Sequence, residues 1–189
     1  MTGALVAARA QLDPVGFVFV ACLTAVGGGT VRDLLLDRAV FWLADPRPVA
    51  LAAGAAVAVF FTHHLVESRM RWIEWIDAVA LSVAAAAGVA AAQAAGAETW
   101  VQVAMGVATG TLGGLMRDVV CNEVPLVLRR GELYATAALA GGGAAVAARA
   151  ADAPGWAPLT ACVAVTFALR AASLGLGWRL PGFRPRPPR

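Results

Sequence analysis

One short motif occurs twice in this chain, each time inside an apolar segment long enough to cross a membrane. Residues 26–38 read VGGGTVRDLLLDR, and residues 111–123 read TLGGLMRDVVCNE. The Arg32-Asp33 pair aligns with Arg117-Asp118, and the glycines before each pair align at the same constant spacing along the chain. Charged side chains at membrane depth are costly and are usually retained for a function. The duplicated motif therefore predicts a membrane protein whose site is built from two related halves.

The composition excludes a water-soluble globular protein. Of the 189 residues, 60% are hydrophobic and 14% are charged, and the mean hydropathy is +0.72. A soluble domain carries about 25% charged residues, so this chain has too few polar side chains to cover a soluble surface. All 15 basic residues are arginines spread along the chain without forming a patch, which argues against a nucleic-acid partner. We expect a single integral membrane domain over residues 1–189, and no enzymatic activity.

Apolar runs between charged breaks predict an all-α fold with seven transmembrane helices. A membrane-spanning helix needs about 20 apolar residues. The second and fifth segments are too long for one straight crossing, and both contain the glycine motif, which predicts helices kinked at the glycines. The seven segments are 1–12, 14–42, 48–66, 76–96, 100–128, 132–151 and 156–177.

The spacing between the two motifs covers three predicted helices, so the second copy must enter the membrane from the opposite side. Residues 1–66 and 76–151 are therefore expected to form two inverted repeats, followed by a seventh helix at 156–177 and an Arg/Pro-rich tail at 178–189. Arginines concentrate in alternate loops and in the tail. The positive-inside rule then places the C-terminus in the cytoplasm and the N-terminus outside.

The first helix is shorter than its counterpart in the second repeat. Helix 76–96 aligns with a segment that would begin before Met1. Twelve residues of helix rise about 18 Å, against a hydrocarbon core of about 30 Å. We expect the outer half of this helix to lie upstream of Met1, because a start site or a boundary has been placed too late.

The glycines of the two motifs have two possible roles. They can let two helices pack closely, as small residues do in many membrane proteins. They can also break or bend a helix, so that main-chain groups turn toward a water-filled cavity. Duplication at matching places in both halves favours the second role and a transport site. The candidate hinge residues are Gly27, Gly28, Gly29, Gly110, Gly113 and Gly114.

The Arg-Asp pairs are the candidate charges of such a pathway. Neighbouring positions on a helix diverge by about 100°, so each arginine is expected to reach the aspartate of the other copy, or freed carbonyls. The pairs either hold the kinks together or tune the field along an ion path, and both roles can coexist. Possible pore-lining polar residues are Thr24, Thr30, Thr109, Thr111 and Asn122, although threonine often bonds back to its own helix. No resident metal or cofactor is expected.

A soluble family shares part of the first motif. VGGGTVRDLLLDR resembles the glycine-rich signature of tRNA nucleotidyltransferases and poly(A) polymerases. Those enzymes need an Asp-x-Asp pair downstream for two metal ions, and this chain contains no Asp-x-Asp. The motif also occurs twice between membrane spans, so this interpretation is rejected.

The chain resembles the prokaryotic TRIC (trimeric intracellular cation) channel family from Gly3 to about Pro181. The similarity rests on the doubled glycine and Arg-Asp segments and on three further stretches. These are Val40-Phe41-Trp42 before Asp45-Pro46, the run EVPLVLR at 123–129, and ELYAT at 132–136.

This resemblance implies a homotrimer in the inner (plasma) membrane, with bound lipid and one hydrophilic pore per protomer, bounded by the kinked second and fifth helices. It implies permeation of monovalent cations, chiefly K⁺ and also Na⁺. Bacterial members have also been grouped as glycine transporters, so a carrier of glycine or a similar zwitterion is the alternative. The family's first helix begins with an aspartate that would match Asp77, and here that position falls before Met1.

Overall fold

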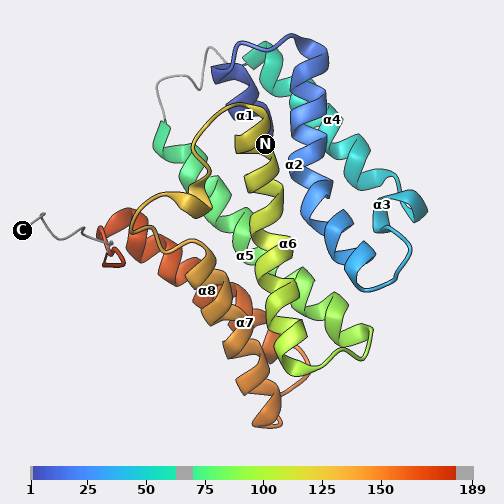
Figure 1. The fold of residues 1–189 in the computed structure, drawn as a ribbon, viewed down its shortest axis with the longest axis vertical. Coiled ribbons are helices and arrows are strands. Elements are labelled where there is room, and N and C mark those ends of the chain that lie inside the picture. Colours follow the sequence, from blue (N-terminus) through green and yellow to red (C-terminus); the bar gives the residue numbers. More distant parts are fainter. Residues whose placement is uncertain (1, 63–69, 182–189) are drawn as a thin grey trace, which may run out of the picture.

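The computed structural model describes residues 2–62 and 70–181, with side-chain surroundings for 2–62 and 73–181. These residues form helices joined by short loops and contain no strand (Figure 1). The end of the first predicted repeat, 63–66, and the tail residues 182–189 lie outside the described residues. The helices are α1 (Thr2–Arg9), α2 (Pro14–Leu35), α3 (Phe41–Ala44), α4 (Arg47–Thr62), α5 (Met70–Ala94), α6 (Thr99–Val120), the 3-10 helix η2 (Leu126–Leu128), α7 (Ala135–Ala150) and α8 (Ala157–Gly175).

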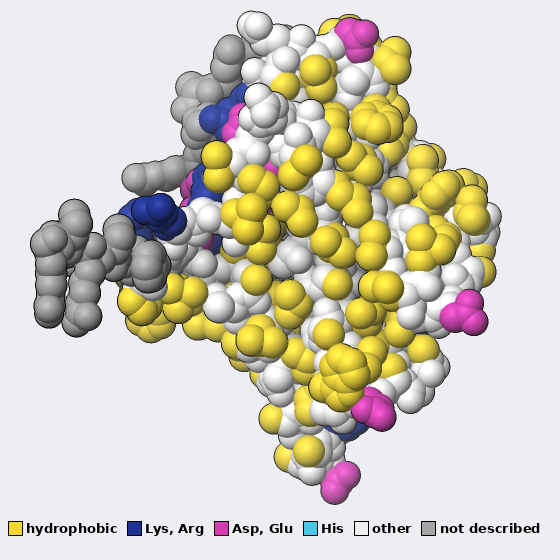
Figure 2. Space-filling model, in the orientation of Figure 1, with side chains coloured by type: hydrophobic (Ala, Val, Ile, Leu, Met, Phe, Trp, Pro, Cys, Tyr) yellow, Lys and Arg dark blue, Asp and Glu magenta, His cyan; other side chains and the backbone are white. Residues whose placement is uncertain are grey.

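Several of these helices have the length and the surface of membrane spans. Three described stretches, Pro14–Leu35, Ile73–Ala94 and Ala157–Gly175, are long and apolar enough to cross a bilayer. Large apolar side chains point outward, among them Leu51 and Phe61 of α4, which are 74% and 71% exposed. Figure 2 shows hydrophobic side chains spread over a whole face of the molecule, with charged groups mainly at its periphery. A surface of this kind suits lipid and not water.

Helices α2 and α6 lie side by side at the centre of the fold (Figure 1). On one side, α1 and α4 pack against α2, around a core that contains Phe17, Val20 and Val59. On the other side, α5, α7 and α8 pack together around a second core that contains Leu81 and Val89. The α2–α6 contact thus joins the two halves of the chain.

Corresponding helices of the two halves end in the same way. Asp37 and Asn122 occupy matching places in the two repeats, and their φ angles are 51° and 55°. Gln11 and Gly96 form a second matching pair, with φ angles of 53° and 69°. After α2 and α6, such a left-handed residue closes the helix, because the next N–H bonds back to the oxygen of Asp33 or Asp118. The two chain segments therefore have matching backbone turns as well as matching sequences.

The long second and fifth segments are not continuous helices. Helix α2 ends at Leu35 and α6 ends at Val120, so the predicted extents 14–42 and 100–128 were too long. The remaining residues form a turn and a short helix, α3 or η2, because the left-handed residue stops each long helix. Both α2 and α6 are helical without interruption through their glycines, and a bend at those positions stays a prediction.

Candidate functional site

The glycines of the two motifs lie where α2 crosses α6. A Cβ atom on Gly28 would collide with the main-chain oxygen of Thr109, and one on Gly113 would lie 2.5 Å from the main-chain oxygen of Thr24. These two contacts are equivalent, because the repeat aligns Gly28 with Gly113 and Thr24 with Thr109. Any larger residue at either glycine would force the helices apart, so the close-packing role applies to Gly28 and Gly113.

A cavity of about 520 Å³ lies beside this crossing, between residues of α1, α2, α5 and α6. Its walls are mainly alanine and glycine, with Arg32 and Phe41 from the first motif region and Asp77 and Tyr134 from the second half. The same glycines that allow the crossing also line this cavity. Eight of the predicted site residues line it: Thr24, Gly28, Gly29, Arg32, Thr109, Gly110, Gly113 and Gly114.

The other predicted polar residues and Gly27 do not line this cavity. Gly27 faces Met116, whose sulfur would lie 2.8 Å from an added Cβ. The hydroxyl groups of Thr30 and Thr111 donate to main-chain oxygens one turn earlier in their own helices, at 2.8 and 2.9 Å. Asn122 occupies the left-handed position that ends α6. Thr30 and Thr111 therefore bond within their own helices, Asn122 ends α6, and Gly27 packs against Met116.

Each arginine pairs with the aspartate that follows it, so the expected cross-repeat pairing was wrong. Arg32 Nε donates to Asp33 Oδ1 at 2.8 Å, and Arg117 Nε donates to Asp118 Oδ1 at 2.7 Å. The long arginine side chain folds back over the helix end and reaches its neighbour. The other copy is out of reach, because α2 and α6 run in opposite directions and carry their charged pairs at opposite ends (Figure 1).

The second oxygen of each aspartate accepts a hydrogen bond from the segment that follows the helix. Asp33 Oδ2 accepts the N–H of Phe41 at 2.9 Å, and Asp118 Oδ2 accepts the N–H of Leu126 at 3.0 Å. Phe41 begins α3 and Leu126 begins η2, so each carboxylate caps a short helix whose first N–H groups have no partner of their own.

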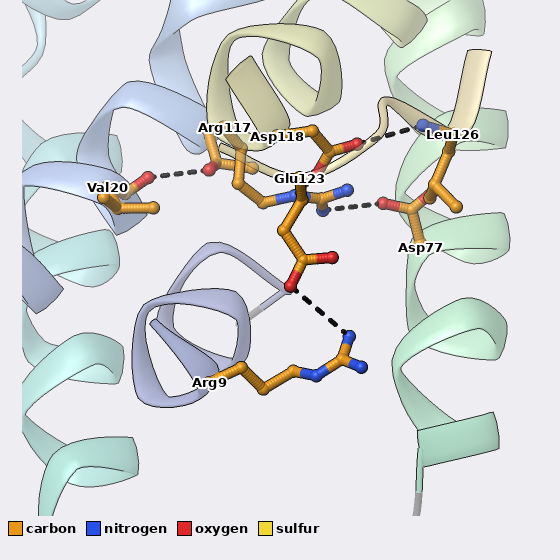
Figure 3. A network of polar contacts seen from close by, with 8 residues as sticks. Arg9, Val20, Asp77, Arg117, Asp118, Glu123 and Leu126 are labelled. Atoms are coloured by element: carbon orange, nitrogen blue, oxygen red, sulfur yellow. Dashed lines mark hydrogen bonds and ion pairs between the residues drawn. The ribbon is translucent and has the colours of Figure 1, made fainter. Parts of the chain in front are cut away.

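Arg117 has a second carboxylate partner that Arg32 lacks among the described residues. Its Nη1 donates to Asp77 Oδ1 on α5 at 3.0 Å, and Figure 3 shows the guanidinium between Asp77 and Asp118. The Arg117 side chain is 1% exposed. Two carboxylates around one guanidinium leave a net negative charge at this end of the cavity.

The Arg117–Asp77 pair lies between two cavities. Asp77 lines the large one, whereas Arg117 and Asp118 line a second cavity of about 70 Å³. The mouth of this smaller cavity carries the looser ion pairs Arg9–Glu123 at 3.9 Å (Figure 3) and Arg129–Glu74 at 3.6 Å. The buried pair therefore separates the large cavity from the smaller one, which we call the vestibule because partly exposed charged side chains line it.

Two buried oxygens of the large cavity lack a well-formed hydrogen bond, although the Tyr134 hydroxyl lies beside the carboxylate to which one of them belongs. Asp77 Oδ2 and Thr109 Oγ1 are buried, and neither makes a hydrogen bond of normal geometry with a residue in 2–62 or 73–181. Buried acceptors are almost always satisfied, by protein or by an ordered ligand or water. A carboxylate and a hydroxyl oxygen are the kinds of ligand that a hard cation takes.

Asp77 and Tyr134 were not predicted as site residues from the sequence. Asp77 appeared there only as the counterpart of an aspartate in the first helix of the family. The signal for Asp77 was present, because it is a carboxylate inside the apolar segment 76–96. Tyr134 gave no such signal, since a single tyrosine before a helix is a common core residue. Its position depends on how α7 packs against α5 and α6.

Comparisons with known proteins show the family to which the chain belongs. Residues 1–64 and 74–150 match the model of a protein family described as "Glycine transporter". The inner membrane protein YadS of Escherichia coli K12, a UPF0126 protein, is 42% identical over 147 residues, which cover 75% of this chain and 69% of YadS. A UPF0126 membrane protein of Deinococcus radiodurans is 37% identical over 147 residues, which cover 76% of this chain and 68% of that protein.

Solved structures place the same fold among TRIC channels. The TRIC trimeric intracellular cation channel orthologue of Rhodobacter sphaeroides has a TM-score of 0.89 and 48% identity, covering 93% of this chain and 91% of that one. This chain belongs to the prokaryotic TRIC family. A second TRIC structure, described as the structural basis for conductance through TRIC cation channels, has a TM-score of 0.87 and 28% identity, covering 98% of this chain and 92% of that one. The family prediction and the all-α membrane fold class are confirmed.

Proposed function

We propose that this TRIC-family protein conducts monovalent cations, chiefly K⁺, through the cavity between α2, α5 and α6. The observation that carries the proposal is a pair of buried oxygens without a well-formed hydrogen bond, Asp77 Oδ2 and Thr109 Oγ1, in the wall of a cavity lined by the apolar helices α2 and α5. A dehydrated cation needs oxygen ligands to replace its water. Unsatisfied buried acceptors supply them without first breaking a protein hydrogen bond.

The charge distribution along the cavity supports passage of a cation. At one end, Arg32 is balanced by Asp33 alone. At the other end, Arg117 faces both Asp77 and Asp118, which leaves one unbalanced negative charge. In surroundings of low dielectric constant, such a charge attracts cations and repels anions strongly.

Conduction requires the Arg117–Asp77 pair to separate, because this pair stands between the large cavity and the vestibule. The arrangement described here is then a closed one. Arg117 keeps Asp118 as a partner when it leaves Asp77, so opening does not leave the guanidinium alone in the membrane. Separation of the pair also makes Asp77 Oδ1, the oxygen that binds Arg117, available to the passing ion.

The family label "Glycine transporter" names the alternative, a carrier for a small zwitterion. Such a substrate needs an ammonium partner and a carboxylate partner within the same site. Of the two atoms described above, one belongs to a carboxylate and the other to a neutral hydroxyl, and the two motif arginines are already held by carboxylates within hydrogen-bond distance. The named relatives of known structure are cation channels. The geometry therefore favours a cation over a zwitterion.

Planar-bilayer recording of the purified protein tests this function. We expect unitary current steps in KCl, and a reversal potential in a KCl gradient that shifts toward the K⁺ equilibrium value. Saturable uptake of radiolabelled glycine into proteoliposomes, in the absence of unitary currents, would contradict the proposal.

The same proposal includes a homotrimer in the inner membrane, surrounded by lipid, with the N-terminus outside and the C-terminus in the cytoplasm. The relatives YadS and the Rhodobacter channel are named an inner membrane protein and a trimeric channel. The orientation rests on the arginine-rich loops. A green fluorescent protein fused after Arg189 is expected to fluoresce, because it folds in the cytoplasm. A dark fusion at normal expression, with an active alkaline phosphatase fusion at the same place, would reverse the orientation.

A further inference from the structure

We propose that Arg170 of α8 is a positioning residue for the conduction site: it holds the ring of Tyr134 against Asp77 at the end of the large cavity. This inference rests on the proposed function. Helix α8 lies outside the duplicated part of the chain, so its role in the site does not follow from the repeat.

Arg170 is placed unusually for a membrane arginine. It is completely buried, and its only described ion-pair partner within residues 73–181 is Glu132, whose Oε2 lies 3.0 Å from Nη1. Its Nε and Nη2 have no hydrogen-bond partner among the described residues. A buried charge with two unused donors costs stability, so it is a candidate for a function beyond packing.

The guanidinium lies over the aromatic ring of Tyr134, with its central carbon 4.9 Å from the ring centroid. At this distance a cation is attracted by the face of the ring. Glu132 precedes Tyr134 by two residues, so Arg170 contacts both the Glu132 carboxylate and the Tyr134 ring within one turn of the chain. The turn before α7 is thereby fixed from α8.

Tyr134 connects the contacts made by Arg170 with the conduction site. Its side chain is buried and lines the large cavity, and its hydroxyl lies beside the Asp77 carboxylate. The same hydroxyl would be 3.1 Å from a Cβ atom on Gly114. The Tyr134 hydroxyl therefore lies close both to Gly114 of α6 and to the Asp77 carboxylate. A change in the angle of the ring alters both the width of the cavity and the access to that carboxylate.

The C-terminal segment is joined to the same turn. The N–H of Leu180 donates to the main-chain oxygen of Gly131 at 2.8 Å, next to Glu132. The turn is thus fixed from α8 and from the chain that follows it. Arg170 acts on the ring directly and through Glu132, whereas Leu180 acts through the main chain at Gly131, and neither Arg170 nor Leu180 lines the cavity.

The sharpest test uses Arg170→Lys, because lysine keeps the charge and loses the flat, forked group that stacks on the ring. The charge near the conduction site is then nearly the same in both proteins, and only the positioning of the Tyr134 ring changes. The matched control is Arg149→Lys. Arg149 also bridges helices, through Gln102 and Gln93, but it lies outside both cavity walls.

Tyr134 is the only tyrosine of the chain, so one label reports on it alone. With 3-fluorotyrosine incorporated, the full-length protein should give a single ¹⁹F resonance. Arg170→Lys is expected to shift or broaden this resonance and to lower the unitary conductance by about two-fold or more, as for mutations that act through a coupled network. Glu132→Gln should move both readouts in the same direction, and Arg149→Lys should move neither.

An unchanged ¹⁹F resonance and conductance in folded Arg170→Lys would overturn the inference, even if the variant melts at a lower temperature. If Arg170→Lys does not fold, Glu132→Gln decides, since it removes the partner and leaves the arginine in place. Failure of the wild-type protein to conduct would contradict the proposed function instead. The ¹⁹F experiment still reports whether Arg170 positions Tyr134 in that case.

Discussion

Asp33 and Asp118 each organise two parts of the chain with one carboxylate. One oxygen binds the arginine just before it, and the other caps the short helix that begins eight residues later. Both oxygens of each aspartate are therefore used. Asp77 differs, because it shares one oxygen with Arg117 and keeps the other free. The first two aspartates therefore hold helix ends in place, and Asp77 is the carboxylate that the proposed function uses to bind the ion.

Removing Arg117 should destabilise the protein strongly. In Arg117→Met, Asp77 and Asp118 lose their buried cation, and breaking a buried ion pair from one side costs about 3–5 kcal/mol. Arg47→Ala is the control, because the Arg47–Asp45 pair lies on the surface and should matter little. Thermal unfolding followed by fluorescence-detected size exclusion measures both. Equal melting temperatures for the two variants would show that the buried pair is not structural.

At the scale of helices, the crossing of α2 and α6 is the contact that joins the two halves. The sequence left two roles open for the duplicated glycines and favoured helix breaking, whereas at Gly28 and Gly113 the structure shows the other role, close packing. The duplicated motifs and the threonines beside them pointed to eight of the cavity-lining residues, whereas those from α1, the alanines of α5, and Tyr134 were not predicted. The sequence does carry a signal for the helix ends, since Asp37-Arg38 follows α2 and Asn122-Glu123 follows α6, but the predicted segments ran past both pairs.

The arginine partners could not be predicted from helix geometry alone. The angle between neighbouring positions argues against a pair such as Arg32-Asp33, but it describes the Cβ directions and ignores the reach of a long side chain. The second partner of Arg117 comes from α5, and only the packing of α5 against α6 brings it close. The role of Arg170 depends on α8, which the repeat does not include.

Substitution of the crossing glycines should separate the helices. Gly28→Ala and Gly113→Ala place a Cβ against main-chain oxygens, which cannot turn away, so we expect a loss of about 1–3 kcal/mol for each. Gly54→Ala on α4 is the matched control, because nothing lies within 4 Å of its added Cβ. Chemical unfolding in detergent compares the three. A Gly28→Ala protein as stable as Gly54→Ala would refute the close crossing.

At the scale of the whole molecule, the exposed surface of the described residues is apolar over much of its area, and small residues such as Gly54 and Gly143 lie open on it. Small residues allow close contact between membrane helices, so part of this surface suits other copies of the chain and the rest suits lipid. The trimer number comes from the relatives.

Native mass spectrometry from mild detergent should give a species of three times 19.3 kDa. This method is preferable to amine-reactive cross-linking, because the chain contains no lysine. Bound lipid is expected to appear as additional mass on the trimer. A monomer or a dimer as the dominant species, under conditions where the Rhodobacter channel stays trimeric, would contradict the assembly.

The central claim is that the free oxygen of Asp77 makes the large cavity a path for cations, and the reversal potential of Asp77→Asn tests it most directly. Asparagine keeps the shape and an acceptor for Arg117 but removes the charge. In a KCl gradient, Asp77→Asn should lower the cation-to-anion permeability ratio by roughly tenfold, equivalent to about 1.4 kcal/mol. The control is Asp152→Asn, which alters an exposed carboxylate after α7 and should leave the ratio unchanged. An unchanged ratio and conductance in folded Asp77→Asn would place the ion path elsewhere.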